Sequence, residues 1–366
     1  MKIAFFTGGR SEYGIIRKLI HTIIEDDFFD VSIIVSGLHL LNEYGYTISE
    51  IEKDNMPISA RIPIYLERKK PDFCDFSNAI NKFSAHLNET RYDAVFIVGD
   101  RFEAYAFALA AHFTNTAIIH SGGGTITSGA MDNIYRYNIT NLSSYHCATS
   151  EGNYKRLLSI PIINKENTYF TGSVAIDSIT DFLSKKHNSI EDAIPGIKRD
   201  KYVLITFHSV TNSFEPTDLL LKFSVDLIIE NGHQVLITFP NNDPGADKII
   251  DVIESFINIP NVFVVKSLGA LDYYKAMFDC KFLLGNSSSG IIEAAYFNKF
   301  VINVGSRQEG REKDANVIHV DADFIQLEKS IVLLLEKDLC KPKNNKIYGD
   351  GNSILKIIKI LKNKFK

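Results

Sequence analysis

Short apolar runs alternate with amphipathic segments along nearly the whole chain. In the first half, the runs that we expect to form strands are 1–6, 31–36, 93–99, 117–120, 146–149 and 169–174. Helical patterns occupy 15–24, 47–54, 73–90, 103–113, 132–143 and 151–158, and the rest of 42–66 looks irregular. Strands that alternate with helices predict parallel sheets whose faces are covered by helices.

The second half repeats this alternation. Its expected strands are 202–206, 234–238, 262–265, 281–285 and 300–304, and its expected helices are 219–231, 247–256, 271–278, 291–297 and 353–366. Between the halves, residues 179–201 are polar and weakly patterned and contain Pro195 and Gly196. We therefore predict an α/β protein of two doubly wound, Rossmann-like domains, with a cleft where their strands end. The expected boundaries are 1–178, a linker at 179–201, 202–347 and a terminal segment at 348–366.

Composition narrows the class of protein. The chain has 366 residues, of which 45% are hydrophobic and 23% charged, and its net charge is -4. Without a basic field, nucleic acid is excluded as the main partner. No apolar run approaches the ~20 residues that span a bilayer, and the amino terminus lacks the features of a signal peptide, so we expect no membrane partner. Cys74, Cys147, Cys280 and Cys340 are widely spaced, which favours a reduced, cytoplasmic protein.

A small polar loop in the second half has the composition of a phosphate site. It follows the expected strand 281–285, and its residues are Asn286, Ser287, Ser288, Ser289 and Gly290. A strand, a small-residue loop and a helix start direct backbone N–H groups and hydroxyls at one spot that favours an anion. Arg307 and Arg311 follow the next strand and would close on the same phosphates. The alternative is an ordinary serine N-cap beside two solvated arginines.

Two candidate groups follow strands of the first half. Arg10 comes after Gly8 and Gly9 in a turn before a helix, where it would bind a phosphate, although a plain strand–helix turn explains the pattern equally well. Asp100 follows the strand 93–99, with Glu103 close behind. A carboxylate at a strand end is suited to act as an acid or base, and it is equally common as a helix N-cap.

Two further candidates are ambiguous from position alone. Asp132 and Arg136 lie one helical turn apart, which by itself favours an exposed ion pair. His208 follows the strand 202–206, where it would donate to a phosphate oxygen or protonate a leaving group near neutral pH, but a lone histidine is usually structural. No metal-ligand spacing occurs, and the glycine-rich turns match neither the dinucleotide nor the Walker pattern. We expect no metal and no cofactor.

Together, the motifs resemble those of the UDP-N-acetylglucosamine 2-epimerase family, and within it the hydrolysing branch. They occur in order as GGRSEYG at 8–14, SGLHL at 36–40, GDRFEA at 99–104, DNIYRYNIT at 132–140, TGSVAID at 171–177, FHSVT at 207–211, PNNDPG at 240–245, GNSSSGIIEA at 285–294, GSRQEGRE at 305–312 and YGDGN at 348–352. The GNSSSG and SRQEGR segments are the ones that point to the hydrolysing branch.

This resemblance implies a GT-B fold, a nucleotide-sugar in the cleft, a final helix that crosses back onto the first domain, and a homodimer. It also implies removal of UDP from a UDP-linked 2-acetamido sugar with inversion at C2, which releases a free manno sugar for sialic-acid-type synthesis. Proton transfer falls to Asp100 and Asp132, and we group Arg136 and His208 with them as catalytic residues and Glu103 with the binding residues. The nucleotide would be held by Ser287, Ser288, Gly290, Glu293, Arg10, His208, Arg307 and Arg311.

The segments expected to face the sugar, the loop after His120 and the helix at 132–143, depart from the family pattern. Family members usually carry an acid after the strand-end histidine, at the position of Gly122, Thr125 or Ser128, and the loop HSGGGTITSG has none. The next helix has Asn133 for a usual Asp, Tyr137 for a usual His and Asn141 for a usual Lys.

Three explanations of this departure remain open. Glu103 or Glu12 replaces the acid, or the substrate is a 2,4-diacetamido-2,4,6-trideoxy sugar of the legionaminic route, or the protein binds nucleotide-sugars with poor turnover. In function, the alternatives to the epimerase are a GT-B glycosyltransferase and a non-catalytic nucleotide-sugar binder.

Overall fold

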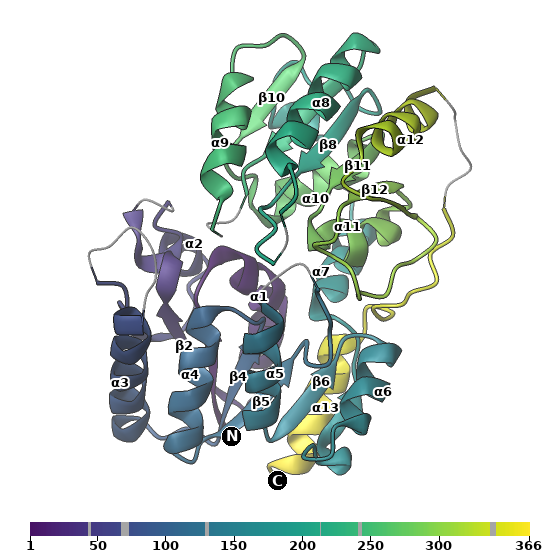
Figure 1. Cartoon of the computed structure of the whole chain (residues 1–366). Helices are drawn as coiled ribbons and strands as arrows, with labels where there is room; N and C mark the ends of the chain where they lie inside the picture. Colours follow the sequence, from purple (N-terminus) through teal and green to yellow (C-terminus); the bar gives the residue numbers. More distant parts are fainter. Residues whose placement is uncertain (43–44, 67–72, 129–131, 213, 241–243, 337–341) are drawn as a thin grey trace. The chain divides into compact units, whose positions relative to one another are not determined.

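The computed structural model describes residues 1–42, 45–66, 73–128, 132–212, 214–240, 244–336 and 342–366. The chain forms two compact units (Figure 1). Unit 1 comprises Met1–Thr125, Asp132–Ser178 and Tyr348–Lys366, and unit 2 comprises Ile126–Met131 and Ile179–Ile347. Part of the PNNDPG motif, residues 241–243, and Cys340 lie outside the described residues.

Unit 1 is built on a parallel sheet of order β3-β2-β1-β4-β5-β6-β7. Its strands are β1 (Lys2–Thr7), β2 (Asp30–Ser36), β3 (Ile58–Ile62), β4 (Ala94–Val98), β5 (Ala117–Ser121), β6 (Tyr145–Ala148) and β7 (Thr168–Phe170). Its helices are α1 (Arg10–Ile24), α2 (Ile48–Lys53), α3 (Phe73–Glu89), α4 (Phe102–Phe113), α5 (Asp132–Leu142), α6 (Glu151–Ser159) and α13 (Ser353–Lys364), and α7 (Val174–Ser184) spans the boundary with unit 2.

Both faces of this sheet are buried under helices, as the uninterrupted apolar strands require. Ile16 of α1 and Ile357 of α13 pack in the core on one face. On the other face, the Phe107 ring of α4 stacks on Phe6 of β1 at a centroid distance of 4.4 Å, and Phe83 of α3 joins them. Because helices cover both faces, polar site residues gather at the carboxyl ends of the strands.

Unit 2 repeats this architecture with a parallel sheet of order β10-β9-β8-β11-β12-β13. Its strands are β8 (Tyr202–Thr206), β9 (Gln234–Thr238), β10 (Val262–Val265), β11 (Phe282–Gly285), β12 (Val301–Val304) and β13 (Val317–Val320). Its helices are α8 (Thr217–Glu230), α9 (Ala246–Ser255), α10 (Gly269–Asp279), α11 (Ser288–Ile292) and α12 (Phe324–Glu336). The apolar faces of α8, α9 and α12 share one core with the strands.

Several elements differ from the sequence prediction. The region 42–66 contains β3, a half-exposed edge strand whose mixed residues ISARI hide its period. Strand β13 and helix α12 had no predicted counterpart. Val174 begins α7 instead of ending a strand, and the helix expected at 291–297 is divided into α11 and a 3-10 turn, Ala294–Phe297, which ends at Asn298 with a left-handed φ of 55°.

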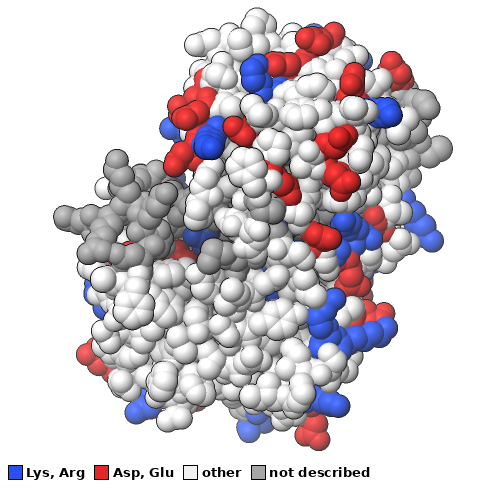
Figure 2. Space-filling view, in the orientation of Figure 1, with Lys and Arg blue, Asp and Glu red and all other residues white. Residues whose placement is uncertain are grey.

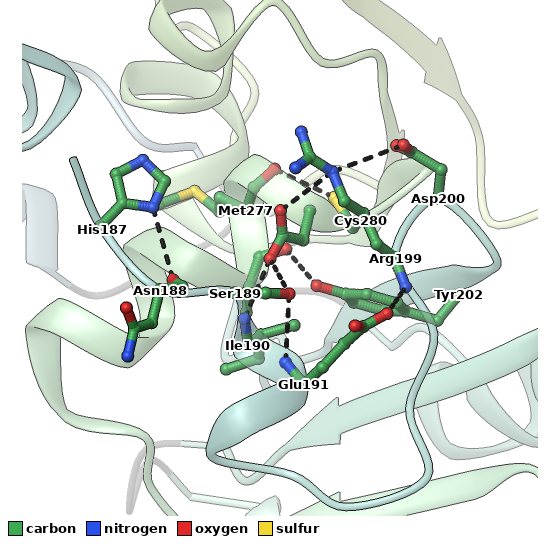
Figure 3. A network of polar contacts seen from close by, with 12 residues as sticks. His187, Asn188, Ser189, Ile190, Glu191, Arg199, Asp200, Tyr202, Met277 and Cys280 are labelled. Atoms are coloured by element: carbon green, nitrogen blue, oxygen red, sulfur yellow. Dashed lines mark hydrogen bonds and ion pairs between the residues drawn. The ribbon is translucent and has the colours of Figure 1, made fainter.

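The segment 187–202 is anchored by polar contacts (Figure 3). Asp279, the buried last residue of α10, accepts hydrogen bonds from the Ser189 hydroxyl at 2.8 Å and the Ile190 N–H at 2.9 Å. Its other oxygen lies 3.3 Å from Nε of Arg199. These contacts tie the polar stretch that precedes β8 to a helix of the same unit.

Within the part of the chain that the structure describes, no helix combines the length and the hydropathy needed to cross a membrane. The described residues also contain no cluster of three His, Cys, Asp or Glu side chains suited to a metal ion. Cys74, Cys147 and Cys280 are free thiols.

Candidate active site

In unit 2, Asn286 joins three chain segments at the ends of β8 and β11. Its Oδ1 accepts from the His208 N–H at 2.7 Å, and its Nδ2 donates to the His208 carbonyl at 2.8 Å. Nη1 of Arg307 and Nε2 of Gln308 donate to the Asn286 carbonyl at 3.3 and 2.9 Å. The structure thereby brings together the predicted histidine, serine loop and arginine loop. Sequence reasoning gave Asn286 no role, and its position directly after a buried strand was the available signal.

The serine loop is organised by hydroxyl contacts. Ser287 occupies the N-cap position of α11, but its side chain makes no capping hydrogen bond and contacts Ser289 Oγ at 3.0 Å. Ser289 Oγ in turn contacts the Tyr273 hydroxyl at 2.7 Å. Ser287 thus takes the N-cap position that the alternative interpretation expected, but without the hydrogen bond of an ordinary cap. Gly290 is required by packing, because a Cβ there would lie 2.9 Å from Val301 Cγ1.

The helix behind this loop is short. Ser288 is its first residue and Glu293 follows its last, and burial raises the pKa of Glu293 to about 7. A helix of one turn contributes little macrodipole. An anion at this loop would therefore have to be held by hydroxyls, backbone N–H groups and the two arginines. The N–H of Arg311 donates to the carbonyl of Gln308 at 3.2 Å, so a turn holds both arginines on one loop.

His208 is almost fully buried, at 7% exposure. Burial, assisted by the positive charge of Arg307, lowers the pKa of His208 well below its ordinary value. The imidazole is then neutral at neutral pH, which argues against the predicted role as a proton donor near pH 7. A neutral ring still donates one hydrogen bond, so the phosphate-binding role is the one that this environment supports.

In unit 1, Asp100 follows β4 and is held by Arg136 of α5. Nε of Arg136 donates to Asp100 Oδ2 at 2.8 Å and Nη2 donates to the same oxygen. Nη1 donates to the Thr125 carbonyl at 3.0 Å and to Asn133 Oδ1 at 2.8 Å. Arg136 is 2% exposed, so the expected exposed ion pair is wrong. The N-cap of α4 is Arg101, so the capping alternative for Asp100 is wrong as well.

His120 contacts the two segments that carry Asp100 and Arg136. Its Nε2 contacts the Gly99 carbonyl at 3.1 Å and its Nδ1 contacts Thr140 Oγ1 of α5 at 3.2 Å. Burial lowers the pKa of His120 to about 4, so the ring is neutral and bridges the end of β4 to α5. Sequence reasoning used His120 only as the start of the loop.

The remaining predicted residues of unit 1 differ in their exposure. Arg10 is the exposed first residue of α1, and Asp132 is the half-buried first residue of α5. Glu103 is fully buried and its Oε1 accepts from the Tyr65 hydroxyl at 2.6 Å. At Thr125, one of the three candidate positions of the missing loop acid, Oγ1 accepts a hydrogen bond from Asn153 Nδ2 at 2.9 Å.

Comparison with known proteins identifies relatives over the full length. The family model described as UDP-N-acetylglucosamine 2-epimerase matches residues 21–362. The Legionella pneumophila UDP-N,N'-diacetylbacillosamine 2-epimerase (hydrolyzing) is 32% identical, over 99% of this chain and 95% of its own length. The Campylobacter jejuni GDP/UDP-N,N'-diacetylbacillosamine 2-epimerase (hydrolyzing) is also 32% identical, over 92% of this chain and 88% of its own.

The fold has a solved counterpart as well. The structure of UDP-GlcNAc 2-epimerase from Neisseria meningitidis bound to UDP-GlcNAc aligns with a TM-score of 0.85 at 19% identity, covering 100% of both chains. The two parallel sheets are those of a GT-B-like α/β protein, as predicted. The chain therefore belongs to the UDP-N-acetylglucosamine 2-epimerase family, as a nucleotide-sugar 2-epimerase of its hydrolysing branch.

Proposed function

We propose that this enzyme acts on a UDP-linked 2,4-diacetamido-2,4,6-trideoxy sugar and releases UDP and the free sugar inverted at C2. The observation that carries this choice is the 32% identity, over nearly the whole chain, to two relatives named for diacetylbacillosamine. The altered sugar side supports it, because the loop lacks the acid that the resemblance leads one to expect at Gly122, Thr125 or Ser128, and Asn133 replaces a usual aspartate. UDP-N-acetylglucosamine, the substrate first suggested by the resemblance, is the competitor to test.

The chemistry divides between the two groups of residues. A carboxylate removes the C2 proton, the C2–H electron pair forms a C1–C2 double bond, and the C1–O bond breaks with its electrons on UDP. Water then adds to C1, and a proton reaches C2 on the opposite face. We assign proton transfer to Asp100 and Asp132, worth ~10²–10⁴-fold. Neutralisation of the departing diphosphate falls to Arg10, Arg307 and Arg311, and the neutral His208 donates one hydrogen bond to it.

The nucleotide contacts are assigned by the same proposal. Ser287, Ser288 and the backbone at Gly290 meet the diphosphate, and Glu293 accepts from the ribose hydroxyls. Hydroxyl and N–H donors suit phosphate oxygens, and a carboxylate suits a pair of vicinal hydroxyls. Glu103 supports the sugar side without contacting solvent.

The test is incubation of the enzyme with single nucleotide-sugars in heavy water. We expect UDP and a manno-configured sugar to appear together, with deuterium at C2, and kcat/KM for the diacetamido substrate at least ~10-fold above that for UDP-N-acetylglucosamine. Asp132→Asn should lower turnover by ~10²–10⁴-fold and preserve UDP binding. A reversed preference would reassign the substrate, and retention of the original C2 hydrogen would refute the reaction.

We also propose that the enzyme is a homodimer that associates through α3, α4 and α5. In the orientation of Figure 2, the face of unit 1 over these helices carries few charged side chains. Tyr105 contacts the rings of Phe76 and Tyr135 at centroid distances of 5.4 and 5.8 Å, and Phe113 and Ile134 are 76% and 62% exposed. Sedimentation equilibrium should give a dimer, and Ile134→Asp should give a monomer; a monomeric wild type would refute the proposal.

A further inference from the structure

Two glutamates form a buried pair beside the turn that begins α1. Glu12 is 3% exposed and Glu103 is fully buried. They flank Gly8, where a Cβ would lie 3.1 Å from Glu103 Cβ and 3.4 Å from Glu12 Oε2. Sequence alone offered either residue as a substitute for the missing loop acid, but their burial removes both from direct contact with solvent.

The two carboxyl groups have different partners. Glu103 lies 3.3 Å from Nε of Arg101 and accepts from the Tyr65 hydroxyl. Glu12 Oε2 accepts only the Gly8 N–H, at 2.6 Å, and in the described structure its Oε1 is buried without a hydrogen-bond partner.

The ion pairs around the two glutamates indicate which of them is protonated. Arg136 pairs with Asp100 and Arg101 pairs with Glu103, and none of the described ion pairs includes Glu12. An unpaired buried carboxylate is far costlier than a neutral carboxyl group. The proton of this cluster therefore resides on Glu12.

Glu12 also lies beside the backbone that carries the proposed base. A Cβ at Gly99 would lie 3.3 Å from Glu12 Oε1, and Gly99 has a left-handed φ of 89°. Gly99 directly precedes Asp100, and its carbonyl receives the His120 contact that leads to α5. A charge that appeared on Glu12 would act first on this turn.

We propose that Glu12 is a positioning residue that must be a neutral carboxylic acid in the working enzyme, and that its ionisation displaces the Gly99–Asp100 turn and disables Asp100. The role assigned to Asp100 rests on the proposed function. The protonation state of Glu12 does not, so the two are tested separately.

The surroundings of Glu12 fix the direction of its titration. Burial, followed by the charge of Glu103, raises the pKa of Glu12 to about 8; Asp100 acts in the same sense, and Arg101 and the Gly8 N–H oppose it. Burial lowers the pKa of the nearby His39 to about 4, so this ring supplies no compensating charge. The other charged or titratable groups around the pair are Arg10, which acts on His39, Tyr65, which contacts Glu103, and Arg136, which contacts Asp100.

The first test is the pH profile of turnover. Wild-type kcat should fall about tenfold per pH unit above pH ~8, because one group ionises. Glu12→Gln, which resembles the neutral acid, should keep neutral-pH kcat within about threefold and lose this alkaline limb. Glu12→Ala should lower kcat at every pH and leave UDP affinity unchanged, and the exposed Glu89→Gln should match the wild type. An alkaline limb that persists in Glu12→Gln overturns the proposal.

The second test requires no substrate. Glu12 has a higher pKa in the folded than in the unfolded chain, so folding takes up a proton and stability falls as pH rises from about 5 to 8. In urea titrations, the unfolding constant of the wild type should rise relative to that of Glu12→Gln by up to tenfold per pH unit across this window. If the unfolding constants of wild type and Glu12→Gln had the same pH dependence, Glu12 would be ionised in the folded protein, which would overturn the proposal. Failure of Glu12→Gln to fold at any pH would do the same, because the amide is a close mimic of the neutral acid.

Discussion

The buried Arg136 forms an ion pair with the partly exposed Asp100 between α5 and the end of β4, with 2.8 Å between Nε and Oδ2. In sequence, Arg136 is placed to meet Asp132, one turn away on the same helix. In the structure, the guanidinium group of Arg136 also donates to the Thr125 carbonyl. Arg136 therefore connects the proposed base, Asp100, to the loop after β5. A guanidinium group suits this position because its donors have a fixed geometry.

Asp100→Asn should lower kcat by ~10²–10⁴-fold, because an amide cannot accept the C2 proton. UDP affinity should be unchanged, because Asp100 is not among the proposed ligands of the diphosphate. The variant should also lose on the order of 3 kcal/mol of stability, because the buried guanidinium group of Arg136 loses its carboxylate contact with Asp100. Steady-state kinetics, calorimetric UDP binding and urea unfolding measure the three effects. Wild-type turnover in this variant would remove Asp100 from the mechanism.

Arg307→Ala should weaken UDP binding by roughly 10- to 100-fold, since hydrogen bonds to charged groups are worth about 1.5–3 kcal/mol. The expected loss has two parts, the proposed contact with the diphosphate and the observed contact with the Asn286 carbonyl at 3.3 Å. Isothermal titration with UDP provides the measurement. Lys329→Ala, an exposed cation of the same unit, is the matched control for charge. Equal affinities in the two variants would show that Arg307 does not bind the nucleotide.

UDP affinity should rise with pH between about 6 and 8. Burial raises the pKa of Glu293 to about 7, so below this pH the carboxyl group is largely protonated in the free enzyme. Ribose hydroxyls bind better to the carboxylate, so binding releases a proton and weakens as pH falls through 7. In Glu293→Gln the affinity should be lower and should follow only the titration of the phosphate, near pH 6. Parallel pH dependences in wild type and variant would contradict this assignment.

Gly285→Ala should destabilise unit 2 severely, by about 3 kcal/mol or more. Gly285 has a φ of 138°, and a Cβ there would lie 2.0 Å from the Thr206 carbonyl oxygen. Gly14→Ala is the matched control, because nothing lies within 4 Å of its Cβ position in the interior of α1. It should be neutral or stabilising by up to ~1 kcal/mol. Thermal unfolding of both variants checks the pair, and a stable Gly285→Ala protein would show that the turn relaxes.

The sequence by itself determined most of the local structure. Apolar runs of strand length and helices of period 3.6 are visible without tertiary contacts, and so is the position of each polar loop at a strand end. Elements without such a pattern escaped prediction, such as the half-exposed β3. The helix expected at 291–297 failed for a related reason, because an apolar composition does not specify whether a helix continues past Glu293.

Only the tertiary structure decided which side chains meet and which are charged. Asp100, His120 and Arg136 come together because β4 and β5 are neighbours in the sheet and α5 packs beside them. Asn286 contacts His208 because β11 lies next to β8. Periodicity encodes the face that a residue occupies, whereas strand order sets its distant neighbours. The neutral state of Glu12 follows from those neighbours, since burial beside Glu103 exists only in the folded chain.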